Sequence, residues 1–326
     1  MILELPSLGG VQGTNLMNEE AGGEETDMIH PFGVHADWNE SFYFNFYDSE
    51  NDYCGFMRIG LKPNKDEKNM FCFFLSPEGE EIGTRVVEPF TDSQLSVEGL
   101  KFDRIAPDKE WRLRYDGSMK QTRGSEVHRL NVSFDLTFKA INKVFDYRES
   151  DSGYSDLVSH VSPAEHTEQF GKFEGTATIG TKKLSISGLG ERDHAWGTTD
   201  WISPSTWIWL SGQFSEGLAF NFTKLFIGRE TVDAGYIHIG GVNRPIVKVE
   251  VVTQVKKNGG PESLKVWLME ADGKMHEIEA TVMRTARLPY AGSIERSVSV
   301  VYETLARYRM GNETGYGIAE YLVRER

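Results

Sequence analysis

The chain has 326 residues, of which 39% are hydrophobic and 12% aromatic, which is enough for a buried core and too much for a disordered chain. Its 49 acidic residues outnumber the 35 basic ones, giving a net charge of -14. Lys and Arg form only short pairs, which argues against nucleic acid or an anionic membrane as a partner. The length suits two domains of about 150 residues each.

No feature of the sequence predicts a membrane span or a secretion signal. No run of about 18 apolar residues occurs, and the first residues lack a basic start followed by an apolar segment. The only cysteines, Cys54 and Cys72, lie in apolar runs, as is typical of a protein from a reducing compartment. We therefore expect a cytoplasmic protein without a transmembrane segment. The sequence carries no signal for an oligomeric state.

The first elements in chain order are a polar lead-in and an aromatic strand. Residues 1–29 are rich in Gly, Glu and Asn and predict a loosely held N-terminal segment. Residues 39–47 then alternate, with Phe42, Phe44 and Phe46 on one face and the tyrosines and asparagines on the other. Glu40 precedes this stripe on the phenylalanine side. We predict a strand whose phenylalanines face a core.

Further short strands follow at intervals of about ten residues, with little helical periodicity, and the chain contains 33 glycines. This pattern is typical of an antiparallel barrel or sandwich. A polar stretch begins at Arg148, and a short helix is predicted over residues 155–166. We place a boundary there and expect an N-terminal β domain over residues 30–160 and a C-terminal β domain over residues 161–326.

The richest stretch in chemical groups is residues 188–201, with the sequence GLGERDHAWGTTDW. We predict that its glycines place it at a bend between strands. If Arg192, His194 and Trp196 are extended, their side chains point the same way, and Glu191 and Asp193 point the other way. In the next strand Trp207 and Trp209 share one face.

The motif GERDHAWGTTDW resembles the G-x-R-D-H-S/A-W-G-x-x-D-W element of the carotenoid 1,2-hydratase (hydroxyneurosporene synthase) superfamily. The stretches NESFYFNFYD and GYGIAEYLVR resemble that family's first strand and its ending. The resemblance implies an all-β chain of two lipocalin-like (calycin-like) antiparallel β-barrels in tandem. It also implies an apolar pocket and places the motif in the second barrel. Similar pairs of barrels include tocopherol cyclases, pericyclases and lipid-binding proteins, so the fold does not select one reaction.

These residues fit acid catalysis of alkene hydration, cyclisation or isomerisation on an isoprenoid-like, terpenoid or polyketide-like molecule. A carboxyl group donates a proton only if burial raises its pKa, and indole faces stabilise the resulting cation. We assign Asp193, His194 and Asp200 as the catalytic residues. The candidate substrate-binding residues are Arg192, Trp196, Trp201, Trp207, Trp209, Glu40, Tyr43 and Asn45. The hypothesis needs no metal and no organic cofactor.

Two alternatives remain open. A lipid or isoprenoid carrier of the same fold would bind the ligand without chemistry. An Arg-Asp-His cluster beside tryptophans is also typical of a hydrogen-bonded corner that joins two barrels. The strand over residues 218–226 offers few further polar groups, which weakens the case for hydration. The eight histidines show neither H-x-H nor H-E-x-x-H spacing, so the sequence predicts no zinc site.

Overall fold

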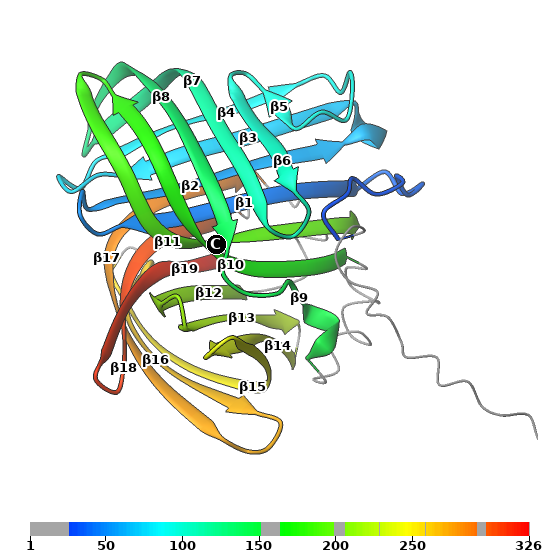
Figure 1. The fold of residues 1–326 in the computed structure, drawn as a ribbon, viewed down its shortest axis with the longest axis vertical. Helices are drawn as coiled ribbons and strands as arrows, with labels where there is room; N and C mark the ends of the chain where they lie inside the picture. The colour runs from blue at the N-terminus through cyan, green and yellow to red at the C-terminus, as the bar shows by residue number, and fades with distance from the viewer. Residues whose placement is uncertain are drawn as a thin grey trace, which may run out of the picture.

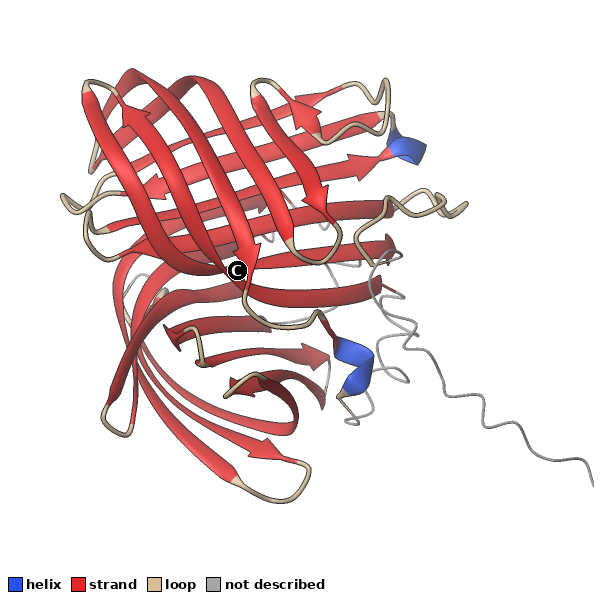
Figure 2. Cartoon of the chain, viewed as in Figure 1, coloured by secondary structure: helices blue, strands red, loops and turns tan. Residues whose placement is uncertain are grey.

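The structure is a computed structural model that describes residues 26–150, 164–198, 206–227, 229–257, 259–291 and 298–325. In these ranges the ordered elements are antiparallel strands and two short 3-10 turns, as Figure 2 shows. The turns are η1 (Pro63–Lys65) and η2 (Tyr147–Glu149). The expected all-β class is confirmed.

The first sheet contains the strands of the N-terminal half and closes on itself. Its strands are β1 (Trp38–Asp48), β2 (Tyr53–Lys62), β3 (Glu67–Leu75), β4 (Glu81–Glu88), β5 (Ser96–Val97), β6 (Leu100–Ala106), β7 (Glu110–Arg123), β8 (Glu126–Ala140), β9 (Phe145–Asp146), β10 (Ala164–Ile179) and β11 (Lys182–Thr198). β1 pairs with β11, and β4 pairs with the far end of β7. These two pairings turn the sheet into a barrel.

The second sheet is a closed barrel of consecutive strands. They are β12 (Thr206–Ser215), β13 (Leu218–Ile227), β14 (Glu230–Ile239), β15 (Val242–Val255), β16 (Pro261–Glu270), β17 (Met275–Ala291), β18 (Val298–Met310) and β19 (Glu313–Glu325). β12 pairs with β19 and closes the ring. The chain therefore forms two antiparallel barrels in tandem, stacked one above the other in Figure 1.

Each barrel has its own core, and further apolar clusters join the two. In the first barrel Phe42, Phe44 and Phe46 face inward, as their alternation predicts. In β12, Ile208 faces the core of the second barrel. Trp209, on the opposite face, packs between the barrels. The outward-facing side chains of these strands therefore form the contact between the two barrels.

The motif lies in the first barrel, which corrects the domain assignment from the sequence. We expected the second unit to begin at residue 161 and to carry the motif. Instead β10 pairs with β8, and β11 pairs with β1 along residues 189–198. The turn between β10 and β11 is a short hairpin, so both strands add to the first sheet. Most of the predicted helix lies outside the described residues, and its last residues belong to β10.

The predicted bend at the motif is also wrong, because residues 188–198 continue one long strand. Gly188 and Gly190 instead allow the backbone of β1 to approach β11 closely. A Cβ at Gly190 would lie only 1.9 Å from the carbonyl oxygen of Asn45 on the neighbouring strand. The end of the predicted lead-in is not loose either, since Asp27 is buried against the first barrel.

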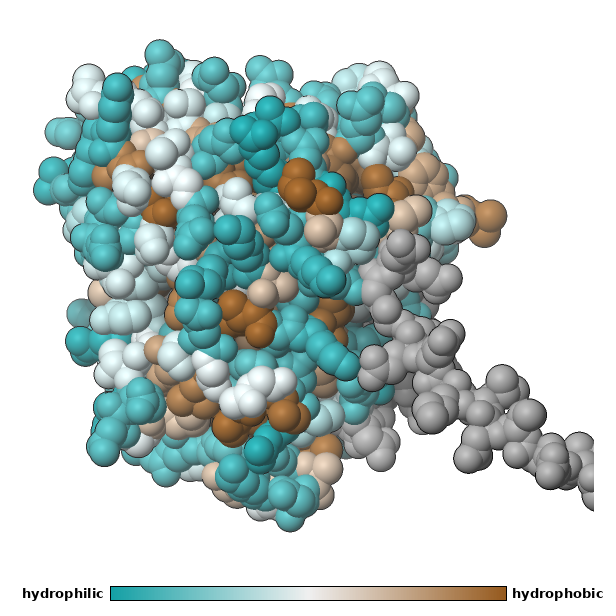
Figure 3. Space-filling model, viewed as in Figure 1, coloured by the Kyte–Doolittle hydropathy of each residue, from teal (hydrophilic) through white to brown (hydrophobic). Residues whose placement is uncertain are grey.

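The surface in Figure 3 is mostly polar, with small, separate apolar patches on the face viewed. No helix in the described ranges has the length and apolar character needed to cross a membrane.

Candidate functional site

The alternation of β11 divides the motif between two environments. Arg192 and His194 point into the first barrel, where His194 stacks on Phe42 with ring centroids 4.0 Å apart. Glu191 and Asp193 point to the opposite face, where Glu191 lies near Ser211 and Asp193 lies near Glu320 of the second barrel. This confirms the orientation predicted from the two-residue repeat. It also separates Asp193 from His194, which we had expected to act together.

Inside the first barrel, His194 belongs to a buried cluster with Glu40 and His30. Nε2 of His194 lies 3.0 Å from Oε1 of Glu40, and Nδ1 of His30 lies 2.8 Å from the same oxygen. Burial raises the pKa of Glu40, but its contacts with the His194 and His30 rings outweigh burial and leave that pKa below its usual value. Burial lowers the pKa of His194. Trp196 stacks on His30 with centroids 3.9 Å apart.

Arg192 contacts three polar side chains in the same interior. Its Nε donates to Gln169 at 2.7 Å, and its terminal nitrogens lie 2.5 Å from Asp27 and 3.5 Å from Asp108. The side chain is 3% exposed. These contacts match the structural reading of the motif, in which arginine ties the chain segment before β1 to the barrel wall.

On the opposite face of β11, a second ionisable cluster lies between the barrels. Nε2 of His166 lies 2.8 Å from Oε1 of Glu168 and 3.2 Å from Oδ2 of Asp193. Glu168 and Asp193 are directly opposed across β10 and β11. The indole N–H of Trp209 donates to Glu168 at 2.9 Å. The two barrels therefore share one cluster, because β10 and β11 supply its charges and β12 supplies its indole.

Burial and the Asp193 charge raise the pKa of Glu168 to about 7. Burial alone would lower the pKa of His166, but Asp193 and Glu168 reverse that effect and hold it well above its usual value. The cluster thus keeps a proton on the histidine and, near neutral pH, exchanges one at Glu168. A carboxyl group in that state can act as a general acid.

More carboxyl groups adjoin the cluster. Burial raises the pKa of Glu191 far above its usual range, and the same holds for Glu303 of the second barrel. Burial also raises the pKa of Glu320, next to Glu303, to about 7. Within the described ranges, several buried side-chain atoms at this junction lack a well-aligned hydrogen bond, namely Oε2 of Glu168, Oδ1 of Asp193, both carboxyl oxygens of Glu191, the hydroxyl of Tyr43, Nδ2 of Asn45 and Nδ2 of Asn221. Such groups are expected to bind water or a polar ligand group.

The remaining predicted residues fall on different faces. Tyr43 and Asn45 are buried at the junction, and Tyr43 meets the ring of Trp209 edge-on at 5.8 Å. Trp207 is half-buried and donates to Thr223 at 2.6 Å. Asp200 and Trp201 lie outside the described residues.

Sequence reasoning missed His166 and Glu168, the centre of the junction cluster. His166 was assigned to the end of a helix and Glu168 to the residues after it, although their two-residue spacing places both on one face of a strand. Glu303 and Glu320 were missed because an isolated glutamate in a strand normally faces solvent. The sequence signal that could have identified them is a single acidic residue within an apolar run of each of the two strands, β18 and β19.

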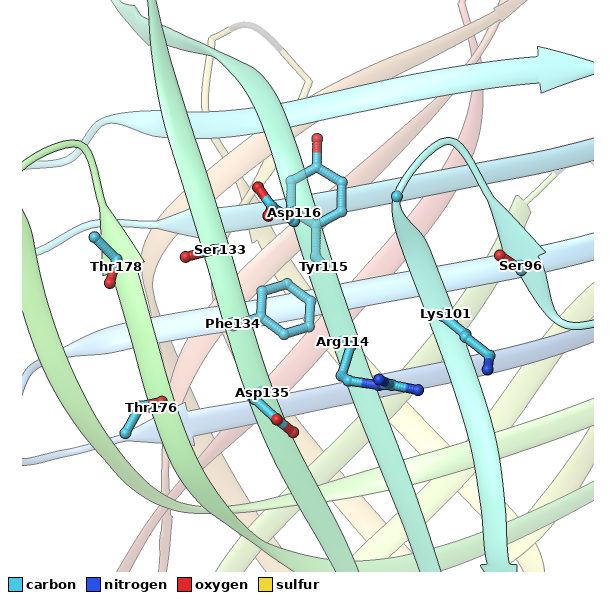
Figure 4. Close-up of a pocket in the computed structure, with 11 residues that line it drawn as sticks. Ser96, Lys101, Arg114, Tyr115, Asp116, Ser133, Phe134, Asp135, Thr176 and Thr178 are labelled. Atoms are coloured by element: carbon cyan, nitrogen blue, oxygen red, sulfur yellow. The ribbon is translucent and has the colours of Figure 1, made fainter.

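Two surface hollows lie away from the motif. The first, about 480 Å³ in volume, is open on the outer face of β6, β7, β8 and β10, with Arg114, Asp135 and Thr176 around it in Figure 4. The second, about 400 Å³, lies near β4 and β7. Neither is lined by a motif residue, so the apolar pocket expected at the motif stays a prediction.

Comparison with known families matches residues 23–324 to one family model, described as "Domain of unknown function (DUF7064)". The chain belongs to the DUF7064 family. A search of the curated proteins finds no match to this DUF7064 member.

Solved structures share the fold of this DUF7064 member at low identity. Kievitone hydratase from Nectria haematococca is 15% identical, with a TM-score of 0.59 over 87% of this chain and 88% of the hydratase. An ATTH-like protein from Nitrosomonas europaea is 12% identical over 89% and 94% of the two chains, also with a TM-score of 0.59. CghA is 7% identical over 88% of each chain, with the same TM-score. At these identities the likeness shows the common two-barrel fold.

Proposed function

We propose that this DUF7064 member is an enzyme that protonates a hydrophobic, unsaturated small molecule between its two barrels. The substrate class is isoprenoid, terpenoid or polyketide-like, and the reaction is alkene hydration, cyclisation or isomerisation. One observation carries the proposal: the buried carboxyl group of Glu168, with a pKa of about 7, lies against the indole of Trp209. A buried acid beside an aromatic ring combines a proton donor with a group that stabilises a cation.

The chemistry balances with protein groups alone. The O–H bond of protonated Glu168 breaks as a C–H bond forms at one alkene carbon, leaving a cation on the other. An aromatic face contributes about 0.5 to 2 kcal/mol to that cation. Water or an internal nucleophile then adds, and the released proton returns to the carboxylate; in isomerisation, loss of a neighbouring C–H proton ends the step. His166 holds Glu168 and Asp193 in place through its two contacts.

The proposal changes the roles assigned from the sequence. Asp193 stays in the site as a partner of His166, and Tyr43, Asn45 and Trp209 stay as lining residues. Asp200 and Trp201 also remain part of the proposal. The contacts of Arg192 and His194 support positioning roles inside the first barrel, and His166 replaces His194 as the histidine of the acid cluster.

Membership of the carotenoid 1,2-hydratase superfamily belongs to this proposal as well. The motif resemblance supports it, and one protein of the same fold carries the name kievitone hydratase. Hydration is therefore the first reaction to test.

The experiment is native mass spectrometry of the protein purified from its own host, followed by extraction and identification of bound organic molecules. Turnover of the identified class is then measured with wild type, Glu168→Gln and Glu174→Gln. Glu174 lies on the same strand but is about half exposed, so it is the matched control. An enzyme keeps its ligand and loses turnover only in Glu168→Gln. A bound ligand with no turnover by wild type identifies a carrier, and a protein that binds nothing supports the structural corner.

A further inference from the structure

Two histidines and a glutamate from distant parts of the chain meet inside the first barrel. Oε1 of Glu40 lies 2.8 Å from Nδ1 of His30 and 3.0 Å from Nε2 of His194. One possible ligand atom from each of the three residues lies within 4.8 Å of the other two. Glu40 and His194 are fully buried, whereas the His30 side chain is 20% exposed. Imidazole nitrogen and carboxylate oxygen are ligands of divalent transition metals.

The hydrogen bonds of His194 leave a lone pair in this cluster. Its Nδ1 lies 2.5 Å from the carbonyl oxygen of Thr26. Since a carbonyl only accepts, Nδ1 carries the hydrogen, and Nε2 of the neutral ring is an unprotonated acceptor. Nε2 faces the Glu40 carboxylate, which is also an acceptor. Two acceptors 3.0 Å apart require a cation between them, either a proton or a metal ion.

Neighbouring residues hold these three side chains in place, as they do around the ligands of a metal site. A metal-bound histidine commonly donates its other N–H to a carbonyl, as His194 does to Thr26. The backbone N–H of His30 donates to both Glu40 oxygens, at 3.0 and 3.1 Å. Stacking on Phe42 and Trp196 fixes the two imidazole rings. Tetrahedral ligands on an ion with bonds of about 2.1 Å lie about 3.4 Å apart, so zinc binding would widen the separations of 2.8 and 3.0 Å by about half an ångström.

The junction cluster offers a poorer site. Among the described residues, His166 is the one histidine of that cluster, and a proton on its Nε2 satisfies Glu168 and Asp193 together. The Glu168 oxygen that faces His166 also accepts the indole N–H of Trp209. The second cluster therefore fits a proton, and the first fits a metal.

We propose that His30, Glu40 and His194 bind one divalent first-row transition-metal ion, with zinc as the first candidate. The open side of the site is at His30. The ion would fasten the segment before β1 to β11. This site is on the opposite face of β11 from the proposed acid and does not depend on the proposed function.

The test uses the full chain after treatment with a chelator. Zn²⁺ is titrated by calorimetry, and Co²⁺ is titrated by its visible absorption. The expected result is one equivalent per wild-type chain, an absorption band of protein-bound cobalt, and a higher melting temperature with either ion. His30→Gln and Glu40→Gln should each weaken binding by more than about a hundredfold.

Two controls locate the site. His35→Gln removes a histidine whose side chain is 60% exposed, and His166→Gln removes the histidine of the other cluster. Both should bind as wild type does. The partly exposed His30 serves as the first variant, and Glu40→Gln keeps an acceptor for the backbone of His30; circular dichroism confirms that each is folded. Absence of a tight equivalent in wild type, unchanged binding in His30→Gln, or loss in His166→Gln would each overturn the proposal.

Discussion

Replacing Glu168 with glutamine removes the acidic proton while preserving the size and the acceptor oxygen of the side chain. In the folded protein burial and Asp193 raise the pKa of Glu168 from 4.5 to about 7. Keeping this group ionised in the folded state therefore costs about 3 kcal/mol relative to the unfolded chain. Glutamine carries no such cost.

The sign of the pH effect follows from proton binding. Between pH 4.5 and about 7 folded Glu168 holds a proton that the unfolded chain has released. The contribution is complete below that range and is lost as pH rises through about 7, so wild-type stability falls with rising pH. Relative to wild type, Glu168→Gln should gain about 3 kcal/mol at about pH 8 and almost nothing at about pH 4, below both pKa values. Glu303 and Glu320 are present in both proteins, whereas the pKa values of Glu191 and His166 depend on Glu168, so the difference reports Glu168 together with these two neighbours.

The assay is urea unfolding of wild type, Glu168→Gln and the exposed control Glu174→Gln across that pH range. The free energy of unfolding of the control should depend on pH in the same way as that of wild type. On the identified substrate, loss of the acid should lower kcat by about 10² to 10⁴. Parallel stability curves for wild type and Glu168→Gln would refute the reasoning, because they would show that Glu168 does not titrate near neutrality.

Three further perturbations test the packing of the motif and of the apolar core. Arg192→Leu leaves the buried carboxylate of Asp27 without its cation and should lower the free energy of unfolding, measured in urea, by about 3 to 5 kcal/mol. Arg112→Leu removes one partner of an exposed ion pair and should change that free energy little. Equal losses would contradict the buried network. Gly190→Ala places a methyl group against a neighbouring backbone and should cost about 1 to 3 kcal/mol, while Gly217→Ala meets nothing and should be nearly neutral. Similar midpoints for both alanine variants would disprove the close approach. Burial raises the pKa of both cysteine thiols, so iodoacetamide should label them only in urea, and labelling of the folded protein would show that they are accessible.

Local alternation was sufficient to predict the strand faces but not their partners. The repeat Phe42, Phe44, Phe46 identified an inward face, and the motif repeat separated His194 from Asp193 before any tertiary information. The pairing of β1 with β11 joins Glu40 to His194 across 154 residues, and no local pattern encodes it. Strand order across the sheet also decided that the motif belongs to the first barrel.

The sequence also failed to predict which charged side chains are buried. A glutamate in a strand is normally expected to face solvent, and the contact between the two barrels reverses that for Glu168, Glu191 and Glu303. Their raised pKa values follow from the contact between the barrels, not from their neighbours in sequence.

The two faces of β11 make its length as important as its composition. Inserting or deleting one residue between Leu189 and Arg192 would move every later side chain of the strand to the opposite face. His194 would then enter the junction, and Asp193 would enter the aromatic interior of the first barrel. A change of two residues would preserve the faces and shift only the register. In this family, length changes in this strand should therefore occur in pairs or be matched by β1 and β10.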